Sequence, residues 1–451
     1  MQFKDCLTEV SGLQYVCDCM KVCSPLGKSQ LLHFPFLVSP ESIQRELDRV
    51  ENQIAFVREN PGAEVALIMA LHEVHDISQT ILNLKRMQVL DDIEFFELKK
   101  FALNSQKILE LVRNQPDIRL CDLSKVVKTL DPEDSKIEHF YIYSVYDSEL
   151  EPLRKQAQQT DDADERERLN WEIAQVEDRV RRKLSEMLHP YWESLQKNQQ
   201  EIAALDLLNA KAQMAMEWNL CKPEISSEST SYTHVFHPEI KRILQERGAD
   251  FQAIDIMMEQ KPCLITGANM SGKTVLLKSL DLAQHLFQFG FYVPAEKARI
   301  VPVEEVFCVI DDRQTEQKGL SSFAVEILNI NKIIERTKQG RHLLVLVDEL
   351  ARTTNPDEGR SIVNAFVMMM DKYKVMSLIS THYGGVAAHC RRLRVKGLIM
   401  NKITDDITPK NLNRFMDYSL VETTSDEVPT EALTIARIFH ADEEFLKLAG
   451  K

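Results

Sequence analysis

The glycine loop at residues 267–274 constrains the fold of this chain more than any other feature. It reads G-A-N-M-S-G-K-T, follows the apolar run 263–266 and precedes a helix-like stretch at 275–280. The order of strand, glycine loop and helix is typical of a phosphate-binding loop, whose glycines let backbone N–H groups curl around phosphate oxygens. The sequence therefore predicts a site for a nucleoside triphosphate.

The residues of this loop have expected roles at the nucleotide. Lys273 would reach the β- and γ-phosphates, Thr274 would hold Mg²⁺, and the helix that begins here would point its positive end at the anion. A chance glycine loop is the alternative, and the second nucleotide motif described next argues against it. The expected nucleotide-binding residues are Gly267, Asn269, Met270, Ser271, Gly272, Lys273 and Thr274.

The strand-like run 343–347 ends in the acidic pair Asp348 and Glu349. Such a pair at the end of a buried strand is the Walker B arrangement, in which Asp348 would bind the Mg²⁺ shell and Glu349 would orient or deprotonate the attacking water. An acidic N-cap for the next helix is the alternative, but the phosphate loop favours catalysis. The run 375–380 ends just before His382. That position would bring His382 near the γ-phosphate, as a sensor or hydrogen-bond donor.

Composition and charge limit the class of protein. The chain has 451 residues, 44% of them hydrophobic, which supports packed cores in roughly two or three domains. Its formal net charge of −14 opposes a protein that coats itself in nucleic acid but allows a local basic groove. The N-terminus lacks the order of a signal peptide, and no apolar run approaches a membrane span. Nine cysteines without an export signal indicate reduced thiols, so we expect a cytoplasmic protein with no membrane partner.

The composition and the spacing of apolar residues change along the chain. Residues 1–135 are poor in glycine and carry apolar residues every three or four positions, as helices do. Residues 136–221 favour a long helical pair interrupted at Pro190. The stretch 222–235 is polar and rich in Ser and Thr, which indicates a linker. Residues 236–451 alternate apolar runs with helical stretches, which is typical of a parallel α/β domain. The first long helix has an apolar stripe at Leu169, Ile173, Val176, Val180, Leu184 and Met187.

Taken together, these motifs resemble those of the MutS family of mismatch-repair ATPases. The glycine loop is similar to the family's G-P-N-M-G-G-K-S, residues 348–359 to its D-E-I-G-R-G-T-S-T-x-D-G, and residues 380–383 to its A-T-H-Y. Residues 321–326 resemble its S-T-F-M-V-E. The resemblance implies an α/β P-loop NTPase domain of the ABC/MutS type, preceded by an all-α core that resembles the family's lever region.

The resemblance also implies ATP and Mg²⁺ as ligands and a homodimer in which each subunit completes the other's site. Ser321 and Ser322, at the start of a helix, would then contact the γ-phosphate across the dimer. Phe251 lies where the family stacks an aromatic ring on adenine. Ala351 and Thr353 replace two glycines of the family's pattern, but no catalytic side chain is replaced.

Other parts of the family's pattern find no counterpart. Residues 24–28 and 146–154 resemble segments of the lever region, but no mismatch-reading domain is matched before them. Where the family carries a DNA clamp, only residues 155–186, rich in Asp and Glu, connect Arg154 to Met187. We therefore expect a short form of the family, without the mismatch reader, the clamp or an appended endonuclease domain.

Three functions follow as hypotheses. The first is an ATPase whose dimer couples ATP binding and hydrolysis to conformational change in DNA mismatch repair or DNA structure recognition. The alternative is a protein-directed ATPase, for example a reactivating factor for a cobalamin-dependent aminomutase, because that branch of the family resembles this trimmed form. The third is a nucleotide-binding module without turnover, against which Glu349 argues.

Overall fold

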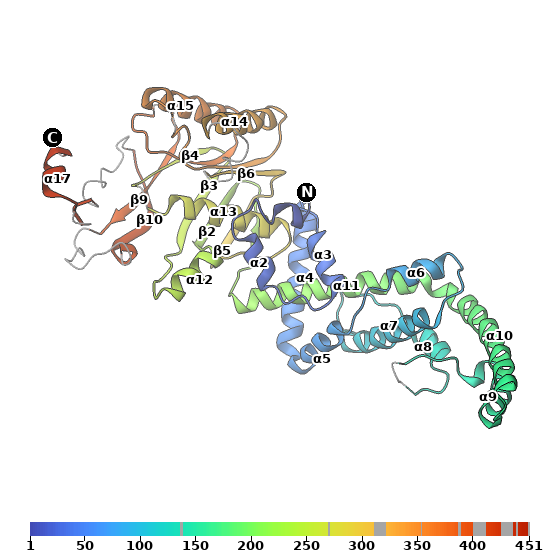
Figure 1. The fold of residues 1–451 in the computed structure, drawn as a ribbon. Helices are drawn as coiled ribbons and strands as arrows, with labels where there is room; N and C mark the ends of the chain where they lie inside the picture. Colours follow the sequence, from blue (N-terminus) through green and yellow to red (C-terminus); the bar gives the residue numbers. More distant parts are fainter. Residues whose placement is uncertain are drawn as a thin grey trace. The chain divides into compact units, whose positions relative to one another are not determined.

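The computed structural model describes residues 1–135, 139–268, 271–310, 322–352, 354–386, 389–399, 412–424, 436–438 and 441–449 (Figure 1). The chain divides into two compact units. The glycine-loop unit consists of Met1–Met20, Phe34–Asp48 and Gln213–Lys451, and the helical unit consists of Lys21–His33 and Arg49–Ala212. The linear domain boundaries expected from the sequence do not follow this division, and they stay predictions.

The helical unit is built from helices with polar caps. It contains α3 (Pro25–Leu32), α5 (Pro61–His72), α6 (Ser78–Lys85), α7 (Asp92–Leu111), α8 (Ser124–Leu130), η1 (Ser144–Tyr146), α9 (Leu150–Gln159), α10 (Ala163–Leu188) and η2 (His189–Tyr191). Two further helices, α4 (Pro40–Glu59) and α11 (Trp192–Glu217), contribute residues to both units. At the start of α7, Asp91 and Glu94 form a capping box, in which each side chain accepts from the other's backbone N–H. Such a box satisfies two helix-end donors.

The helices α9 and α10 form a hairpin in which only residues 160–162 reverse the chain (Figure 1). Between residues 155 and 187, all of which the structure describes, the chain holds only these two helices. The buried stripe of α10 comprises Leu169, Val176, Val180, Leu184 and Leu188. The expected stripe was wrong at its last position: Met187 is 49% exposed, because residue 188, four positions after Leu184, is the one on the buried face.

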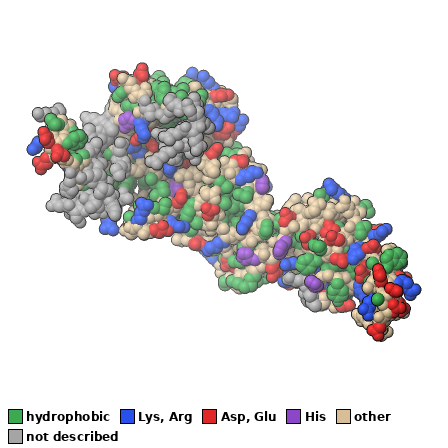
Figure 2. Space-filling model, in the orientation of Figure 1, with side chains coloured by type: hydrophobic (Ala, Val, Ile, Leu, Met, Phe, Trp, Pro, Cys, Tyr) green, Lys and Arg blue, Asp and Glu red, His purple; other side chains and the backbone are tan. Residues whose placement is uncertain are grey.

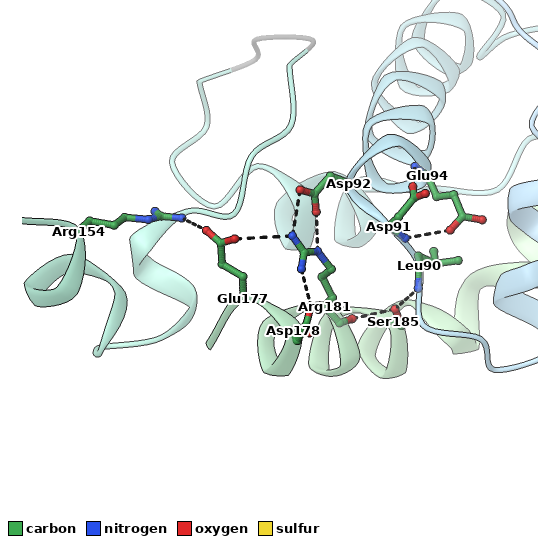
Figure 3. Close-up of polar contacts among 9 residues, drawn as sticks. All are labelled: Leu90, Asp91, Asp92, Glu94, Arg154, Glu177, Asp178, Arg181 and Ser185. Carbon is green, nitrogen blue, oxygen red and sulfur yellow. Dashed lines mark hydrogen bonds and ion pairs between the residues drawn. The ribbon is translucent and has the colours of Figure 1, made fainter. Parts of the chain in front are cut away.

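An ionic network joins α10 to the start of α7 and to α9 (Figure 3). The Arg181 guanidinium contacts the Asp92 carboxylate at 2.8 Å and the Asp178 carboxylate at 2.7 Å, while Glu177 pairs with Arg154 of α9 at 2.8 Å. The Ser185 hydroxyl accepts from the Leu90 backbone N–H at 2.9 Å. Through Arg181 and Ser185, α10 is therefore attached to the segment at which α7 begins.

The glycine-loop unit contains a six-stranded sheet in the order β10-β9-β4-β8-β7-β6. Its strands are β4 (Pro262–Thr266), β6 (Glu305–Val309), β7 (Leu343–Val347), β8 (Met376–Ser380), β9 (Arg391–Leu398) and β10 (Met416–Glu422). Only the β9–β10 pair is antiparallel among these pairings. The apolar runs 263–266, 343–347 and 375–380, expected as strands, form β4, β7 and β8. Their carboxyl ends therefore meet at one edge, where the glycine loop and the acidic pair follow.

Helices cover both faces of this sheet. In Figure 1, α13 (Lys273–Gln288) lies on one side of it, and α14 (Ser322–Lys338) and α15 (Pro356–Lys372) lie on the other. Strands β7 and β8 are buried along their whole length. A parallel sheet covered in this way is the α/β arrangement that the apolar runs predicted.

A second sheet occupies the segment that the sequence indicated as a linker. Its order is β1-β5-β2-β3, with β1 (Glu224–Ile225), β2 (Ser229–Val235), β3 (Ile254–Glu259) and β5 (Lys297–Ile300). Residues 222–235 therefore carry two strands, and β2 pairs with both β3 and β5. The sequence did not indicate these strands, because Ser and Thr are also common in loops. On β2 they alternate with the buried Thr230 and Tyr232, a pattern that a half-buried strand accepts.

The amino-terminal residues pack against the end of α13. The Phe3 and Phe289 rings meet edge to face at 5.0 Å, and the Leu37 backbone N–H donates to the Gln288 carbonyl at 2.8 Å. The remaining elements of this unit are α1 (Phe3–Cys6), α2 (Leu13–Cys19), α12 (Pro238–Glu246), η5 (Leu412–Phe415) and α17 (Glu443–Ala449). Across the described ranges, no helix has the length and apolar character needed to cross a membrane.

Candidate nucleotide-binding site

The glycine loop lies between β4 and α13, as the sequence predicted. Gly272 precedes α13 with a φ of +83°, and a Cβ at this position would lie 2.9 Å from the Tyr418 ring. Both the left-handed backbone and the close ring require glycine here. Because Gly272 has no side chain to cap α13, the first N–H groups of that helix are available to an anion.

Lys273 lies at the first position of α13, and its ammonium points back into the loop. Its Nζ donates to the carbonyls of Gly267 at 2.8 Å and Ala268 at 3.0 Å, and the residue is buried. Burial lowers the pKa of Lys273, while the carboxylates of Glu349 and Asp348 oppose that shift. Among the described residues, the hydrogen bonds of this buried ammonium go to neutral carbonyls. An anionic ligand would compensate its charge.

Thr274, Asp348 and Ser380 form a hydrogen-bonded cluster at the sheet edge. The Thr274 hydroxyl donates to one oxygen of the Asp348 carboxylate at 2.5 Å, and the Ser380 hydroxyl donates to the other at 2.5 Å. The Ser380 oxygen also accepts from the Glu349 backbone N–H at 2.8 Å. The cluster thus fixes the orientation of Asp348 from two neighbouring strands and the start of α13, and it places a hydroxyl and a carboxylate together, the oxygen ligands that Mg²⁺ prefers.

Glu349 and His382 flank this cluster. Glu349 has a φ of +47°, and its carboxylate pairs with the Arg352 guanidinium at 3.0 Å. Burial lowers the pKa of His382, while Glu349 raises it and Lys273 lowers it further. Glu349, Lys273 and Arg352 are the charged groups that shift the pKa of His382. The loop lysine and the acidic residue expected to act on water therefore both lie close enough to His382 to affect its charge.

A nucleotide fits the groups that these residues present. The Ser271 hydroxyl is buried and has no hydrogen-bond partner among the described residues, and an orphaned hydroxyl inside a glycine loop can be satisfied by a phosphate oxygen. Next to it lie the Lys273 ammonium and the Thr274–Asp348 pair. Donors for phosphate and oxygen ligands for a divalent cation are therefore adjacent.

Several expected site residues are not described or lie apart from the cluster. Asn269, Met270 and Ser321 lie outside the described residues, and so does the side chain of Ser322, the first residue of α14. Phe251 is half-buried in the segment before β3. Its neighbour Gln252 donates to the Asp417 carboxylate of β10 at 3.0 Å, and β10 also carries the Tyr418 ring that faces Gly272.

The structure adds three residues to which the sequence gave no role. Ser380 orients Asp348, while Glu326 and Tyr383 both contact the Ala351 backbone. The Ala351 N–H donates to Glu326 at 2.5 Å, and the Tyr383 hydroxyl donates to the Ala351 carbonyl at 2.6 Å. Each of the three lies inside a stretch that resembles a MutS motif, so the sequence did mark these stretches as part of a site. What the sequence lacked was the pairing of β7 with β8 that makes Ser380 a neighbour of Asp348.

The fold and this site define a P-loop nucleotide-binding domain. Residues 263–440 match the family MutS domain V. The chain is 32% identical over 216 residues to the endonuclease MutS2 of Pediococcus pentosaceus, covering 47% of this chain and 27% of the relative. It is 31% identical over 272 residues to the endonuclease MutS2 of Thermus thermophilus, covering 60% of this chain and 34% of the relative. The matches thus span only about a third or less of these relatives. Residues 263–440 therefore form a domain of the MutS domain V family.

Proposed function

We propose that this chain is a MutS-type ATPase that binds and hydrolyses Mg·ATP and changes conformation as it does so. The observation that carries the proposal is the hydrogen bond between Thr274 and Asp348, with a second carboxylate on the next residue, Glu349. Nucleotide binding alone requires the first two groups, whereas hydrolysis also requires a group that orients water. The match to MutS domain V supports the same assignment.

Each group has a distinct part in this proposal. Lys273 would exchange the two loop carbonyls for phosphate oxygens, and Phe251 would stack on the adenine ring. Glu349 would orient the attacking water and take up its proton. His382, whose pKa is lowered by burial, would form a hydrogen bond near the γ-phosphate. Thr274 and Asp348 would hold Mg²⁺, which neutralises phosphate charge when bound.

The proposal includes a homodimer joined through domain V. By resemblance to the family, Ser321 and Ser322 of one subunit would complete the site of the other. A γ-phosphate that is held by both subunits would join them, and its hydrolysis would release them. ATP would therefore act as a switch between two arrangements of the same pair of chains.

Subunit mixing tests hydrolysis and the shared site together. Lys273→Ala should abolish ATP binding in its own subunit, and Ser321→Ala should disable the partner's site. Each variant alone should be inactive, whereas a mixture should regain hydrolysis, since one of the two sites in a mixed dimer keeps both its own lysine and the partner's serine. Failure of the mixture to recover, with an active wild-type protein, would exclude completion in trans. An inactive wild-type protein with Mg·ATP would exclude the ATPase.

The molecule on which this ATPase acts is its client. We propose DNA mismatches or other DNA structures as the first candidate, on the basis of the resemblance to the MutS family. Two observations favour a protein client as the second candidate. The hairpin of α9 and α10 has no inserted domain between residues 155 and 187. On the face shown in Figure 2, acidic and basic side chains are interspersed over this hairpin instead of forming a basic surface.

Salt dependence separates these clients. Binding to DNA releases counterions, so affinity for mismatched or branched DNA should fall steeply as salt rises. We would measure binding to such duplexes at several salt concentrations, with homoduplex DNA as the control. Tight, structure-selective binding with this salt response supports the DNA client. Equal weak binding to all duplexes favours the protein client. The endonuclease activity in the relatives' names is not part of the proposal, because the matches cover only about a third or less of those proteins.

A further inference from the structure

The turn that carries Glu349 away from β7 is held in an unusual backbone conformation. Both Glu349 and Ala351 have left-handed φ angles, +47° and +62°. Left-handed conformations are unfavourable for residues with a Cβ, so two of them within three positions persist only where the surroundings impose them. Ala351 is also fully buried, which means that its peptide groups need partners inside the protein.

Two side chains supply those partners from opposite sides of the Ala351 residue. The Ala351 N–H donates to the Glu326 carboxylate at 2.5 Å, and the Ala351 carbonyl accepts from the Tyr383 hydroxyl at 2.6 Å. Glu326 lies one turn after the start of α14, and Tyr383 lies in the segment just after β8, which ends at Ser380. The turn is therefore attached to a helix on one side and to the end of a neighbouring strand on the other.

The position of Tyr383 is itself determined by a glycine. A Cβ on Gly359 of α15 would lie 2.4 Å from the Tyr383 hydroxyl oxygen, so only glycine leaves room for it. Burial raises the pKa of Tyr383, and the Glu326 carboxylate raises it further. The phenol therefore remains a hydrogen-bond donor, and Glu326 and Tyr383 act on the two peptide groups that flank the Ala351 Cα.

We propose that Glu326 is a positioning residue for Glu349: by accepting the Ala351 N–H, it holds the left-handed turn that aims the Glu349 carboxylate at the nucleotide. Because Glu326 lies on α14, the same contact makes the aim of Glu349 depend on the position of that helix. The helix begins at Ser322, next to the residue expected to contact the partner's nucleotide. The orientation of Glu349 in one subunit would thus depend on whether the start of its α14 contacts the nucleotide of the partner subunit. This inference rests on the proposed ATPase function.

The length of the Glu326 side chain, not its charge, is what the contact requires. Glu326→Gln keeps an acceptor oxygen at the same reach, so it should retain hydrolysis within about threefold of wild type. Glu326→Asp keeps the charge but is one methylene shorter, so its oxygen falls short of the Ala351 N–H. We expect Glu326→Asp and Glu326→Ala to lower kcat about 10- to 100-fold, since small misplacements of a reacting group have large effects on rate. Glu335→Ala, on the exposed part of the same helix, is the matched control.

Three measurements on the full chain test this inference. The first is the steady-state rate, which gives kcat and KM for ATP. The second is equilibrium binding of a fluorescent ATP analogue, which should not change, because Lys273 and the glycine loop are untouched. The third is amide hydrogen exchange in residues 349–352, which should accelerate in Glu326→Asp and Glu326→Ala and stay slow in Glu326→Gln and Glu335→Ala. Exchange reports on the turn whether or not the protein hydrolyses ATP.

The results separate this inference from the proposed function. An inactive wild-type protein contradicts the ATPase proposal, and exchange in residues 349–352 still tests the contact itself. If Glu326→Asp hydrolyses ATP like wild type, or if Glu326→Gln is as slow as Glu326→Ala, the positioning role is wrong. It is equally wrong if kcat falls while exchange in the turn is unchanged. Should Glu326→Ala fail to fold, the comparison between Asp and Gln decides the matter by itself.

Discussion

The Thr274 hydroxyl donates a hydrogen bond of 2.5 Å to the Asp348 carboxylate, although the two residues are 74 positions apart in the sequence. Thr274 follows the glycine loop on α13, and Asp348 follows β7. Strand β8 lies between β4 and β7 in the sheet, and its Ser380 holds the second oxygen of the same carboxylate. Strand β8, the end of β7 and the helix that follows β4 therefore contribute to a single oxygen-rich position.

The first prediction concerns the use of this position by a metal ion. Asp348→Asn removes the charge but keeps the size of the side chain, so the attraction for Mg²⁺ should fall while the phosphate cradle stays intact. We expect the affinity for ATP with Mg²⁺ to drop about tenfold or more, or ~1.4 kcal/mol. Titration of a fluorescent ATP analogue with Mg²⁺ and with EDTA measures the difference. Equal affinities for wild type and variant in the presence of Mg²⁺ would rule out a metal ligand at Asp348.

The second prediction separates binding from hydrolysis at Glu349. Glu349→Gln removes the group that takes up the proton of water but leaves the loop untouched, so ATP should still bind while kcat falls about 100-fold or more. In the dimer proposal, the uncleaved ATP should also keep two subunits together, which light scattering after size-exclusion chromatography detects. Glu358→Gln, an exposed neighbour on α15, is the control. Normal turnover by Glu349→Gln would show that another group orients the water.

The parts of this fold that the sequence predicted are those with strictly local signals. The glycine loop, the apolar strands β4, β6, β7 and β8 and the helical amino-terminal half each depend on residue type and spacing over a few turns. The second sheet was missed because Ser and Thr of β2 carry the signal of a loop as well as that of a half-buried strand. Met187 was misplaced by one position because helical periodicity leaves adjacent residues hard to distinguish at the end of a stripe.

Contacts between distant residues could not be predicted from the same signals. Ser380 and Asp348 meet because β7 and β8 are parallel neighbours, a fact of sheet order that no local pattern carries. The Glu326 contact with Ala351 likewise needs α14 to lie beside the turn after β7. Lys273 and Thr274 lie at the sheet edge, where Thr274 contacts Asp348, whereas the contacts that hold the Asp348–Ala351 turn became visible only in three dimensions.

The third prediction uses the buried His237. Its Nδ1 accepts from the Ile240 N–H at 3.4 Å, and its Nε2 lies 3.2 Å from the Ser11 carbonyl, which is the pattern of a neutral ring. Burial lowers the pKa of His237 to about 4. Between about pH 6.5 and pH 4, His237 is protonated in the unfolded chain but not in the folded chain. Its contribution to the free energy of unfolding is therefore complete above this range and is lost as the pH falls through it.

A change of buffer and one substitution test this pH dependence. The melting temperature of wild type should fall between pH 7 and pH 5, because protonation of His237 in the unfolded chain costs the fold on the order of 3 kcal/mol at the acid end of the window. His237→Asn cannot titrate, so it should show a shallower fall, even if it is less stable at pH 7. His75→Asn, at an exposed site, should keep the wild-type slope. Parallel curves for His237→Asn and wild type would contradict the assignment.

The fourth prediction concerns how the helices end. After α12, α13 and α14 the first left-handed residue is a glycine, at positions 248, 290 and 340, but after α15 it is Lys374, with a φ of +54°. Its neighbour Val375 donates its N–H to the Met370 carbonyl at 2.9 Å, which closes a Schellman motif. Lys374 is exposed, and its ammonium makes an ion pair with Asp371 at 3.1 Å. A lysine here bears the steric cost of the left-handed backbone, and an exposed ion pair offsets little of it.

Lys374→Gly should therefore stabilise the glycine-loop unit by about 1 kcal/mol, after allowance for the greater freedom of glycine in the unfolded chain. The reverse experiment is offered by Gly340, whose φ is +74° and around which a Cβ would meet no atom within 4 Å. Gly340→Ala should destabilise by a similar amount through the backbone alone. Thermal melts of both variants, with ATPase rates as a check that the site is intact, measure the two shifts. If both variants moved the melting temperature in the same direction, the steric cost of a Cβ in the left-handed backbone at residues 340 and 374 could not be the cause.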